Sequence, residues 1–272
     1  MNKNILITGA TDGIGKATAM NMAKQGHRVI VHGRNKRKTE KTIEEIIQKT
    51  GNSRINPLVA DFASFKEVEN AVEYINDHIE KIDILINNAA VILPGYEESK
   101  DGYEMTFQVN YLSPFLLTLG ILPALRKGSR PQIINIASIA HASSLDFSRI
   151  MRRDLYDAYT AYEISKLGNI LFTYKLAEEL RNEGIKVNCL HPGVINTKLL
   201  HVLWSGGAPV NNAVNVINNV INEAEHNNVT GKFFVGNSPS ASSEISYDKS
   251  VQLQIWDFSL KSLKDKGIKV KF

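Results

Sequence analysis

Cysteine is almost absent from the chain, which has one, Cys189, among 272 residues. A single thiol excludes an internal disulfide framework and a cysteine-based metal cluster. Cys189 lies in the apolar run IKVNCLHPG, which indicates a buried structural thiol. No apolar stretch approaches the ~18 residues that span a bilayer, and the first residues, MNKNILITGA, show no signal-peptide pattern. These absences predict a cytoplasmic protein.

An excess of charge of one sign is also missing. The chain has 32 lysines and arginines against 28 aspartates and glutamates, a formal net charge of +4. Its densest basic run, RNKRK at 34–38, is too short for a nucleic-acid surface, and no groove-reading motif accompanies it. We therefore expect a small-molecule partner and no nucleic acid. The composition, 43% hydrophobic and 22% charged, is typical of a globular protein.

Short runs rich in Ile and Val recur along the chain and are mostly continuous, as in strands covered on both faces. They predict strands at 4–8, 28–33, 55–60, 82–88, 131–138, 185–192 and 231–236. Helical patterns stand between them, as at 15–26, 37–51 and 64–81, with Gly26 and Gly51 as C-caps and Ser64 with Glu67 as a capping box. The alternation predicts one α/β domain over 1–272, a Rossmann-type, doubly wound, seven-stranded, mainly parallel sheet with helices on both faces.

The first predicted strand runs into TGATDGIGKATA, where Gly9, Gly13 and Gly15 open a helix. Glycines let the backbone turn sharply and approach a pyrophosphate, which rests on the positive end of the helix. A lone glycine triplet is a weak signal, but its place between a strand and a helix is the one that dinucleotide binding requires. The alternative is a tight strand–helix turn without a ligand.

The second predicted strand ends in HGRN, without the acidic residue that an NAD site usually places there. Arg34 stands instead, and a guanidinium binds a 2′-phosphate through charge-assisted hydrogen bonds. Asn35 adds a donor and Lys38 a further charge. We therefore predict NADP(H) over NAD(H), the alternative being a solvated basic start of the next helix.

The glycine spacing, G-x-x-x-G-x-G, resembles that of the short-chain dehydrogenase/reductase family. Further segments resemble those of the family in the same order, over essentially the whole chain: DILINNAA, VNYLSPF, IINIAS, YEISK and HPGVINT. Two features depart from the pattern: Ala90 stands where the family commonly has glycine, and Ser138 lies 24 positions before Tyr162, about twice the common separation. Four segments resemble the retinol-dehydrogenase-like branch: the longer loop, SIAH, HPGVINTKL and the C-terminal SYDKSVQLQIWDFSLKSL. We expect this chain to be a soluble relative within that branch.

The resemblance implies a cofactor site assembled from several segments. Asp61, at the end of the third strand, resembles the family residue that meets the adenine. The implied cofactor-binding residues are Gly9, Thr11, Asp12, Gly13, Ile14, Gly15, Arg34, Asn35, Lys38, Asp61, Phe62, Asn88, Ala89, Ala90, Tyr162, Lys166, Pro192, Gly193 and Thr197.

Tyr162 and Lys166, in DAYTAYEISKLGN, are four residues apart and so share one helix face. A free tyrosine has a pKa near ~10, and a nearby cation lowers it toward the working pH. By resemblance, Tyr162 is the proton donor in carbonyl reduction and the base in alcohol oxidation, and Lys166 also holds the nicotinamide ribose. Core packing is the alternative for Tyr162.

Two further residues complete the catalytic set implied by the resemblance. Ser138 would hydrogen-bond the substrate oxygen, and Asn110 would hold a water near the lysine. Ser138 could instead cap the strand end, with Ser143 and Ser144 as rivals, and Asn110 could satisfy local backbone groups. We interpret His141 and His191 as structural, and no metal site is predicted.

Together these patterns predict an NADP(H)-dependent oxidoreductase that moves hydride between nicotinamide and the carbonyl or alcohol carbon of a small, lipophilic substrate. A dinucleotide-sensing regulator and a nucleotide-sugar epimerase are the alternatives, and a homodimer or homotetramer is compatible with the pattern. The segment at about 197–225 is predicted to form a substrate lid. Its apolar residues line a pocket or form a short amphipathic helix packed on the body: Leu199, Leu200, Leu203 and Trp204.

Overall fold

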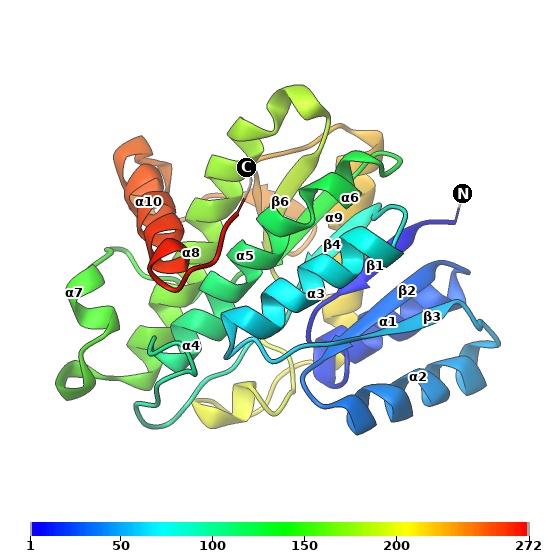
Figure 1. The fold of residues 1–272 in the computed structure, drawn as a ribbon, viewed down its shortest axis with the longest axis horizontal. Coiled ribbons are helices and arrows are strands. Elements are labelled where there is room, and N and C mark those ends of the chain that lie inside the picture. Colours follow the sequence, from blue (N-terminus) through cyan, green and yellow to red (C-terminus); the bar gives the residue numbers. More distant parts are fainter. Residues whose placement is uncertain (1, 271–272) are drawn as a thin grey trace.

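The computed structural model describes residues 2–270, and one sheet runs through them (Figure 1). Its strands lie in the order β3-β2-β1-β4-β5-β6-β7-β8. Every neighbouring pair is parallel except β7 with β8. The strands are β1 (Asn4–Ile7), β2 (Arg28–Gly33), β3 (Ile55–Val59), β4 (Ile84–Asn87), β5 (Gln132–Ile136), β6 (Lys186–His191), β7 (Phe233–Val235) and β8 (Ser238–Ser240).

The predicted α/β fold with a mainly parallel sheet is confirmed, and the structure adds an eighth strand to the seven predicted. The sequence Ser-Pro-Ser of β8 has no apolar pattern, because this short edge strand turns back on β7 after Gly236. Only long-range pairing defines such a strand.

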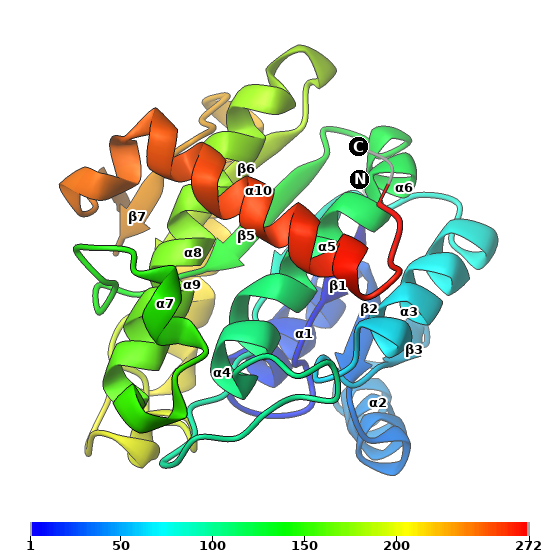
Figure 2. The ribbon, with the colours of Figure 1, turned by 60° about the vertical axis from the view of Figure 1, so that its left-hand side comes forward.

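Helices cover both faces of the sheet (Figure 2). Ile5 and Ile7 of β1 pack toward one set of helices, whereas Leu6 between them packs toward the other. The strands therefore need apolar side chains at successive positions, which explains their continuous Ile and Val runs. The helices are α1 (Gly13–Lys24), α2 (Lys36–Thr50), α3 (Phe65–His78), α4 (Met105–Phe107), α5 (Ser113–Gly120), α6 (Leu122–Arg126), α7 (Phe147–Ile150), α8 (Ala158–Glu179), α9 (Val210–His226) and α10 (Lys249–Asp265).

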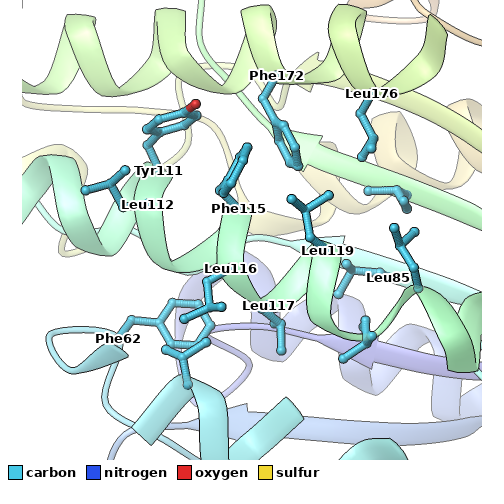
Figure 3. Packing of buried hydrophobic residues seen from close by; sticks show 14 of the residues in the cluster. Phe62, Leu85, Tyr111, Leu112, Phe115, Leu116, Leu117, Leu119, Phe172 and Leu176 are labelled. Atoms are coloured by element: carbon cyan, nitrogen blue, oxygen red, sulfur yellow. The ribbon is translucent and has the colours of Figure 1, made fainter. Parts of the chain in front are cut away.

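Aromatic packing fixes α8 against α5 (Figure 3). The Phe115 and Phe172 ring centroids are 5.0 Å apart, and those of Tyr111 and Phe115 are 6.2 Å apart. A Cβ on Gly168 would lie 2.9 Å from the Tyr111 ring, so glycine permits this close approach. Burying rings of this size stabilises the fold by about 1.5–3 kcal/mol each. The same packing positions α8, which carries Tyr162.

The caps were predicted partly correctly. Gly51 ends α2 in the left-handed region at φ 69°, and Gly26 follows α1 at φ 80°. Ser64 accepts the Glu67 amide hydrogen at 3.3 Å, but the Glu67 carboxylate accepts the Asp61 amide hydrogen at 2.8 Å instead of returning to Ser64. The capping box is therefore half formed, because Glu67 instead holds the turn that follows β3.

The segment predicted as a lid, at about 197–225, contains two kinds of structure. Residues 197–209 are irregular apart from a short 3₁₀ turn at Leu200–Val202. Residues from Val210 onward form α9, which buries Ile217 and Val220 in the core on the α1 side. Only 197–209 therefore has the loose packing that a lid requires.

None of the helices in the described part of the chain is long and apolar enough to cross a membrane.

Candidate active site

A cavity of about 1530 Å³ opens at the carboxyl ends of the central strands. Pockets for drug-sized ligands measure about 300–1,000 Å³, so this cavity has room for a dinucleotide and a substrate together. Many of the predicted site residues line it, namely Gly9, Thr11, Asp12, Gly13, Ile14, Arg34, Asp61, Phe62, Asn88, Ala89, Ala90, Tyr162, Lys166, Pro192 and Thr197. The predicted residues that do not line it are Gly15, Asn35, Lys38, Asn110, Ser138 and Gly193.

The glycine loop forms a cradle at the N-terminus of α1. Gly9 and Gly13 have φ values of 64° and 50°, a region that favours glycine. A Cβ on Gly9 would lie 2.8 Å from Cα of Ala89, and one on Gly15 would lie 2.4 Å from the carbonyl oxygen of Gly9. The loop is therefore too tightly packed for side chains at these positions. The tight turn at a helix N-terminus fits the pyrophosphate of a dinucleotide.

His32, which the sequence did not single out, holds the start of this loop. The Gly9 amide donates to His32 Nδ1 at 3.1 Å, and His32 Nε2 lies 3.0 Å from the carbonyl oxygen of Ala60. Since Nδ1 accepts, Nε2 carries the proton and donates to Ala60. Burial lowers the pKa of His32 to about 4, so the neutral ring persists at neutral pH. The available signal in the sequence was a polar residue, His32, inside an otherwise continuously apolar strand.

The end of β2 presents one cation without a carboxylate partner. Arg34 is exposed and lines the cavity, and no ion pair within residues 2–270 involves it. Asn35 caps α2, its side-chain oxygen accepting the Lys38 amide hydrogen at 2.9 Å. The Lys38 ammonium lies 3.1 Å from the Asp12 carboxylate, so its charge is already paired.

Asp61 and Phe62 lie where the third strand ends. The Phe62 ring stacks on His32 with centroids 4.4 Å apart. The Asp61 carboxylate is 3.3 Å from the ammonium of Lys100, a partner that no spacing in the sequence indicated. This corner is predicted to meet the adenine, and it combines a stacked ring with a carboxylate whose charge is partly offset.

Tyr162 lines the cavity and contacts Ser138, which lies behind the lining. Tyr162 is 7% exposed, and its hydroxyl is in hydrogen-bond contact with Ser138, two residues after the end of β5. Ser138 Oγ also accepts the amide hydrogen of Ala140 at 3.0 Å. Burial raises the pKa of Tyr162, and the bond to Ser138 opposes this rise. The lowering expected from Lys166 together with the positive nicotinamide of a bound cofactor stays a prediction.

Lys166 lies one turn beyond Tyr162 on α8, as the spacing predicted. Its ammonium donates to the carbonyl oxygen of Ile136 at 2.8 Å and is 5.4 Å from the centroid of the Tyr162 ring. Burial lowers the pKa of Lys166 to about 7. The lysine is therefore poised to exchange its proton near neutral pH, beside the phenol.

Asn110 is placed by a π-helical turn at Gln108–Leu112, between α4 and α5. Such turns are frequent at functional sites. The Asn110 side chain accepts the Val91 amide hydrogen at 2.8 Å and donates to the Val91 carbonyl at 3.0 Å and to Ser165 Oγ at 3.1 Å. It thus clamps the loop after β4, as the structural alternative expected. Its predicted role in holding a water stays a prediction.

An apolar wall faces Tyr162. Ile92 and Tyr162 belong to one buried cluster, and Leu199 and Leu203 of the irregular segment at 197–209, here called the mouth segment, pack against that cluster. The Trp204 ring lies edge-on to Tyr162, with centroids 6.0 Å apart. Both ideas for this segment hold in part, because its leucines pack on the body and Leu199 also lines the cavity.

Of the two nearby histidines, His141 has a position that suits a structural role, and the role of His191 stays a prediction. His141 Nδ1 lies 2.7 Å from the Ser138 carbonyl oxygen, and its Nε2 accepts the Ser243 amide hydrogen at 2.9 Å. The ring therefore joins the serine turn to the segment before α10. His191 is buried at the end of β6, and its Nδ1 has no hydrogen-bond partner among the described residues.

This fold and site define a dinucleotide-binding oxidoreductase, and comparison with known proteins agrees. The profile of the family described as short chain dehydrogenase matches residues 3–206. The chain therefore belongs to the short-chain dehydrogenase/reductase family, NAD(P)-dependent oxidoreductases that act on CH–OH groups.

The relatives lie in the branch that the sequence predicted. Retinol dehydrogenase 13 of Mus musculus is 35% identical, covering 93% of this chain and 81% of that protein. Retinol dehydrogenase 13 of Homo sapiens is 39% identical over 72% of this chain and 60% of its own length. The chain thus spans about three fifths to four fifths of these relatives.

Solved structures support the fold. A protein from Mycobacterium paratuberculosis has a TM-score of 0.80 and 24% identity, covering 99% of this chain and 95% of that one. A short chain dehydrogenase from Shigella flexneri, solved in complex with NADP, has a TM-score of 0.70 and 24% identity, covering 88% of this chain and 98% of its own.

Proposed function

We propose that the chain is an NADP(H)-preferring oxidoreductase that interconverts a lipophilic alcohol and its carbonyl form. The observation that carries this proposal is the Tyr162–Ser138 contact beside buried Lys166, next to a cavity large enough for a dinucleotide. The family and the intact tyrosine–lysine pair favour this function over a dinucleotide sensor or a nucleotide-sugar epimerase.

A bound nicotinamide dinucleotide supplies or accepts the hydride at the substrate carbon. The Ser138 hydroxyl donates a hydrogen bond to the substrate oxygen and stabilises charge that develops there. Burial keeps Tyr162 protonated at neutral pH, so its hydroxyl can donate a proton to that oxygen in carbonyl reduction. In alcohol oxidation the phenol must first release its proton to solvent, and the protonated form of Lys166, whose pKa is about 7, stabilises the phenolate.

NADP(H) preference is supported by Arg34. The strand end of β2 offers a guanidinium at the cavity and lacks the carboxylate that would bind ribose hydroxyls and repel a phosphate. Gly33 cannot bear a larger side chain, since a Cβ there would lie 2.5 Å from Thr11 Cγ2. An acidic residue is therefore excluded from position 33 as well.

The apolar wall supports a lipophilic substrate. Leu199 lines the cavity and packs on the cluster that Tyr162 forms with Ile92, and the Trp204 ring lies edge-on to Tyr162, so carbon surface borders this part of the site. Each buried methylene contributes about 0.8 kcal/mol, or roughly three- to fourfold in kcat/KM. The relatives named retinol dehydrogenase point to the same substrate class.

NADPH consumption with straight-chain aldehydes of increasing length tests this function. We expect kcat/KM to rise roughly threefold per added methylene until the wall is covered. Trp204→Ala should flatten this rise, whereas Tyr74→Ala, which removes an exposed ring on α3, should not. A preference for the shortest aldehydes would contradict the lipophilic class, and no turnover of any carbonyl would favour the sensor.

A further inference from the structure

One carboxylate on the glycine loop holds two lysines from distant segments. Asp12 Oδ2 is 3.1 Å from the ammonium of Lys38 and 2.9 Å from that of Lys198. Asp12 Oδ1 accepts the Gly13 amide hydrogen at 2.9 Å and so caps α1. The cap needs one oxygen, and the second joins the glycine loop to α2 and to the mouth segment.

Both lysines belong to segments where a dinucleotide is expected to place phosphate. Lys38 is in the first turn of α2, four residues after Arg34. Lys198 directly follows Thr197 and lines the cavity. Asp12 also lines the cavity, at the positive end of α1. The Asp12 carboxylate therefore occupies a position where the phosphates of a dinucleotide would bind the same two lysines.

We propose that Asp12 determines cofactor affinity by competing with the phosphates of NADP(H) for Lys38 and Lys198. This inference rests on the proposed function. The side chains of Asp12 and Lys38 are 51% and 48% exposed, and that of Lys198 is 88% exposed. Exposed ion pairs contribute little to stability, so the lysines leave Asp12 at small cost when a phosphate arrives.

The two lysines have different expected partners. Lys38 follows Arg34 by four residues at the start of α2, so we expect it to serve the 2′-phosphate that only NADP(H) carries. Lys198 lies beside Thr197, toward the pyrophosphate that both dinucleotides share. Removing Lys38 should therefore weaken NADPH binding selectively, whereas removing Lys198 should weaken NADPH and NADH alike.

Equilibrium titration of the purified protein with NADPH and with NADH tests the inference without turnover. Asp12→Asn keeps an oxygen for the α1 cap and removes the charge. Asp248→Asn is the matched control, because Asp248 caps α10 in the same way at a distance from the cavity. Lys36→Gln controls for Lys38→Gln, since Lys36 lies on the same helix and contacts only Glu40 among the ion pairs of the described residues.

We expect Asp12→Asn to tighten NADPH binding roughly fivefold at low salt, with a smaller gain for NADH and less gain at high salt. The gain should fall by at least half in a Lys38→Gln, Lys198→Gln background, because the released cations cause it. Unchanged or weaker binding in Asp12→Asn would overturn the inference, as would an equal gain in both backgrounds. The proposed NADP(H) preference is tested separately by the wild-type ratio of NADPH to NADH affinity.

Discussion

The ammonium of Lys166 donates to the carbonyl oxygen of Ile136 over 2.8 Å, joining α8 to the end of β5. This acceptor is a neutral carbonyl, so it offsets little of the cost of burying a charge. Burial accordingly lowers the pKa of Lys166 to about 7. The protein thus holds its lysine in a state that costs stability and suits proton exchange near neutral pH.

Replacing this lysine should stabilise the protein in a pH-dependent way. The unfolded chain binds the proton up to its ordinary pKa near ~10.4, whereas the native state releases it near pH 7. The loss of stability caused by burying Lys166 is therefore complete below pH 7 and decreases as pH rises toward 10. Lys166→Met should raise the free energy of unfolding by roughly 2–4 kcal/mol at pH 6.5 and by less at pH 9.5.

Urea unfolding at the two pH values measures this difference. Lys261→Met is the control, because that lysine is exposed on α10 and should change stability by less than about 0.5 kcal/mol. Lower stability of Lys166→Met at pH 6.5 would contradict the prediction, because the native contacts of the charged lysine would then outweigh the cost of burying it.

His191 should make the protein sensitive to acid. Burial, followed by the charge of Lys166, lowers its pKa to about 4, and the unfolded chain binds the proton below about 6.5. The free energy of unfolding therefore falls as pH drops from 6.5 to 4, because over this range the unfolded chain binds a proton at His191 that the native state does not. His191→Leu also removes the unpartnered Nδ1. We expect it to stabilise the protein, by about 2 kcal/mol more at pH 5 than at pH 8.

Thermal or urea unfolding of His191→Leu at pH 5 and pH 8 gives the comparison. His78→Leu, on the exposed side of α3, should show no comparable dependence on pH. Equal effects of His191→Leu at both pH values would mean that the native ring takes up a proton as readily as the unfolded chain does.

Gly15 has no room for a side chain. Because a Cβ there would lie 2.4 Å from the Gly9 carbonyl oxygen and 2.5 Å from Asn88 Nδ2, Gly15→Ala must displace the loop. We expect a loss of roughly 1–3 kcal/mol of stability and about tenfold weaker NADPH binding. Gly95→Ala, which meets no atom within 4 Å, is the control. Wild-type NADPH affinity in Gly15→Ala would contradict the inference that the tightly packed glycine loop holds the dinucleotide.

Arg34 should set the choice between the two cofactors. Arg34→Asp replaces a phosphate-binding cation with a carboxylate that accepts ribose hydroxyls and repels a phosphate. We expect the ratio of NADPH to NADH affinity to fall at least tenfold. Arg37→Asp makes the same charge change on the exposed surface of α2. An unchanged ratio in Arg34→Asp would remove the guanidinium from the phosphate site.

Local spacing predicted the parts of the site that depend on neighbours in the chain. The turn at Gly9 and Gly13 follows from a strand–helix junction, and the shared face of Tyr162 and Lys166 follows from helix geometry. Such features need no knowledge of distant residues. The alternation of strands and helices likewise predicted a mainly parallel sheet, but it did not predict the order of the strands, because long connections join β4, β5, β6 and β7.

Contacts between distant segments could not be predicted. The bond from Gly9 to His32 and the pairing of Asp12 with Lys198 depend on how separate loops meet at one end of the sheet. The raised pKa of Tyr162 likewise reflects burial that only the folded structure sets. Cytoplasmic location and a homodimer or homotetramer stay predictions of the sequence.

The most direct test of the account is the Tyr162→Phe variant, assayed for aldehyde reduction and for NADPH binding. Removing one hydroxyl should lower turnover by roughly a thousandfold while the affinity for NADPH changes by less than about threefold. Tyr159→Phe, one turn earlier on α8 and 40% exposed, should retain turnover within about twofold. Full activity of Tyr162→Phe would contradict the central claim that this hydroxyl delivers the proton.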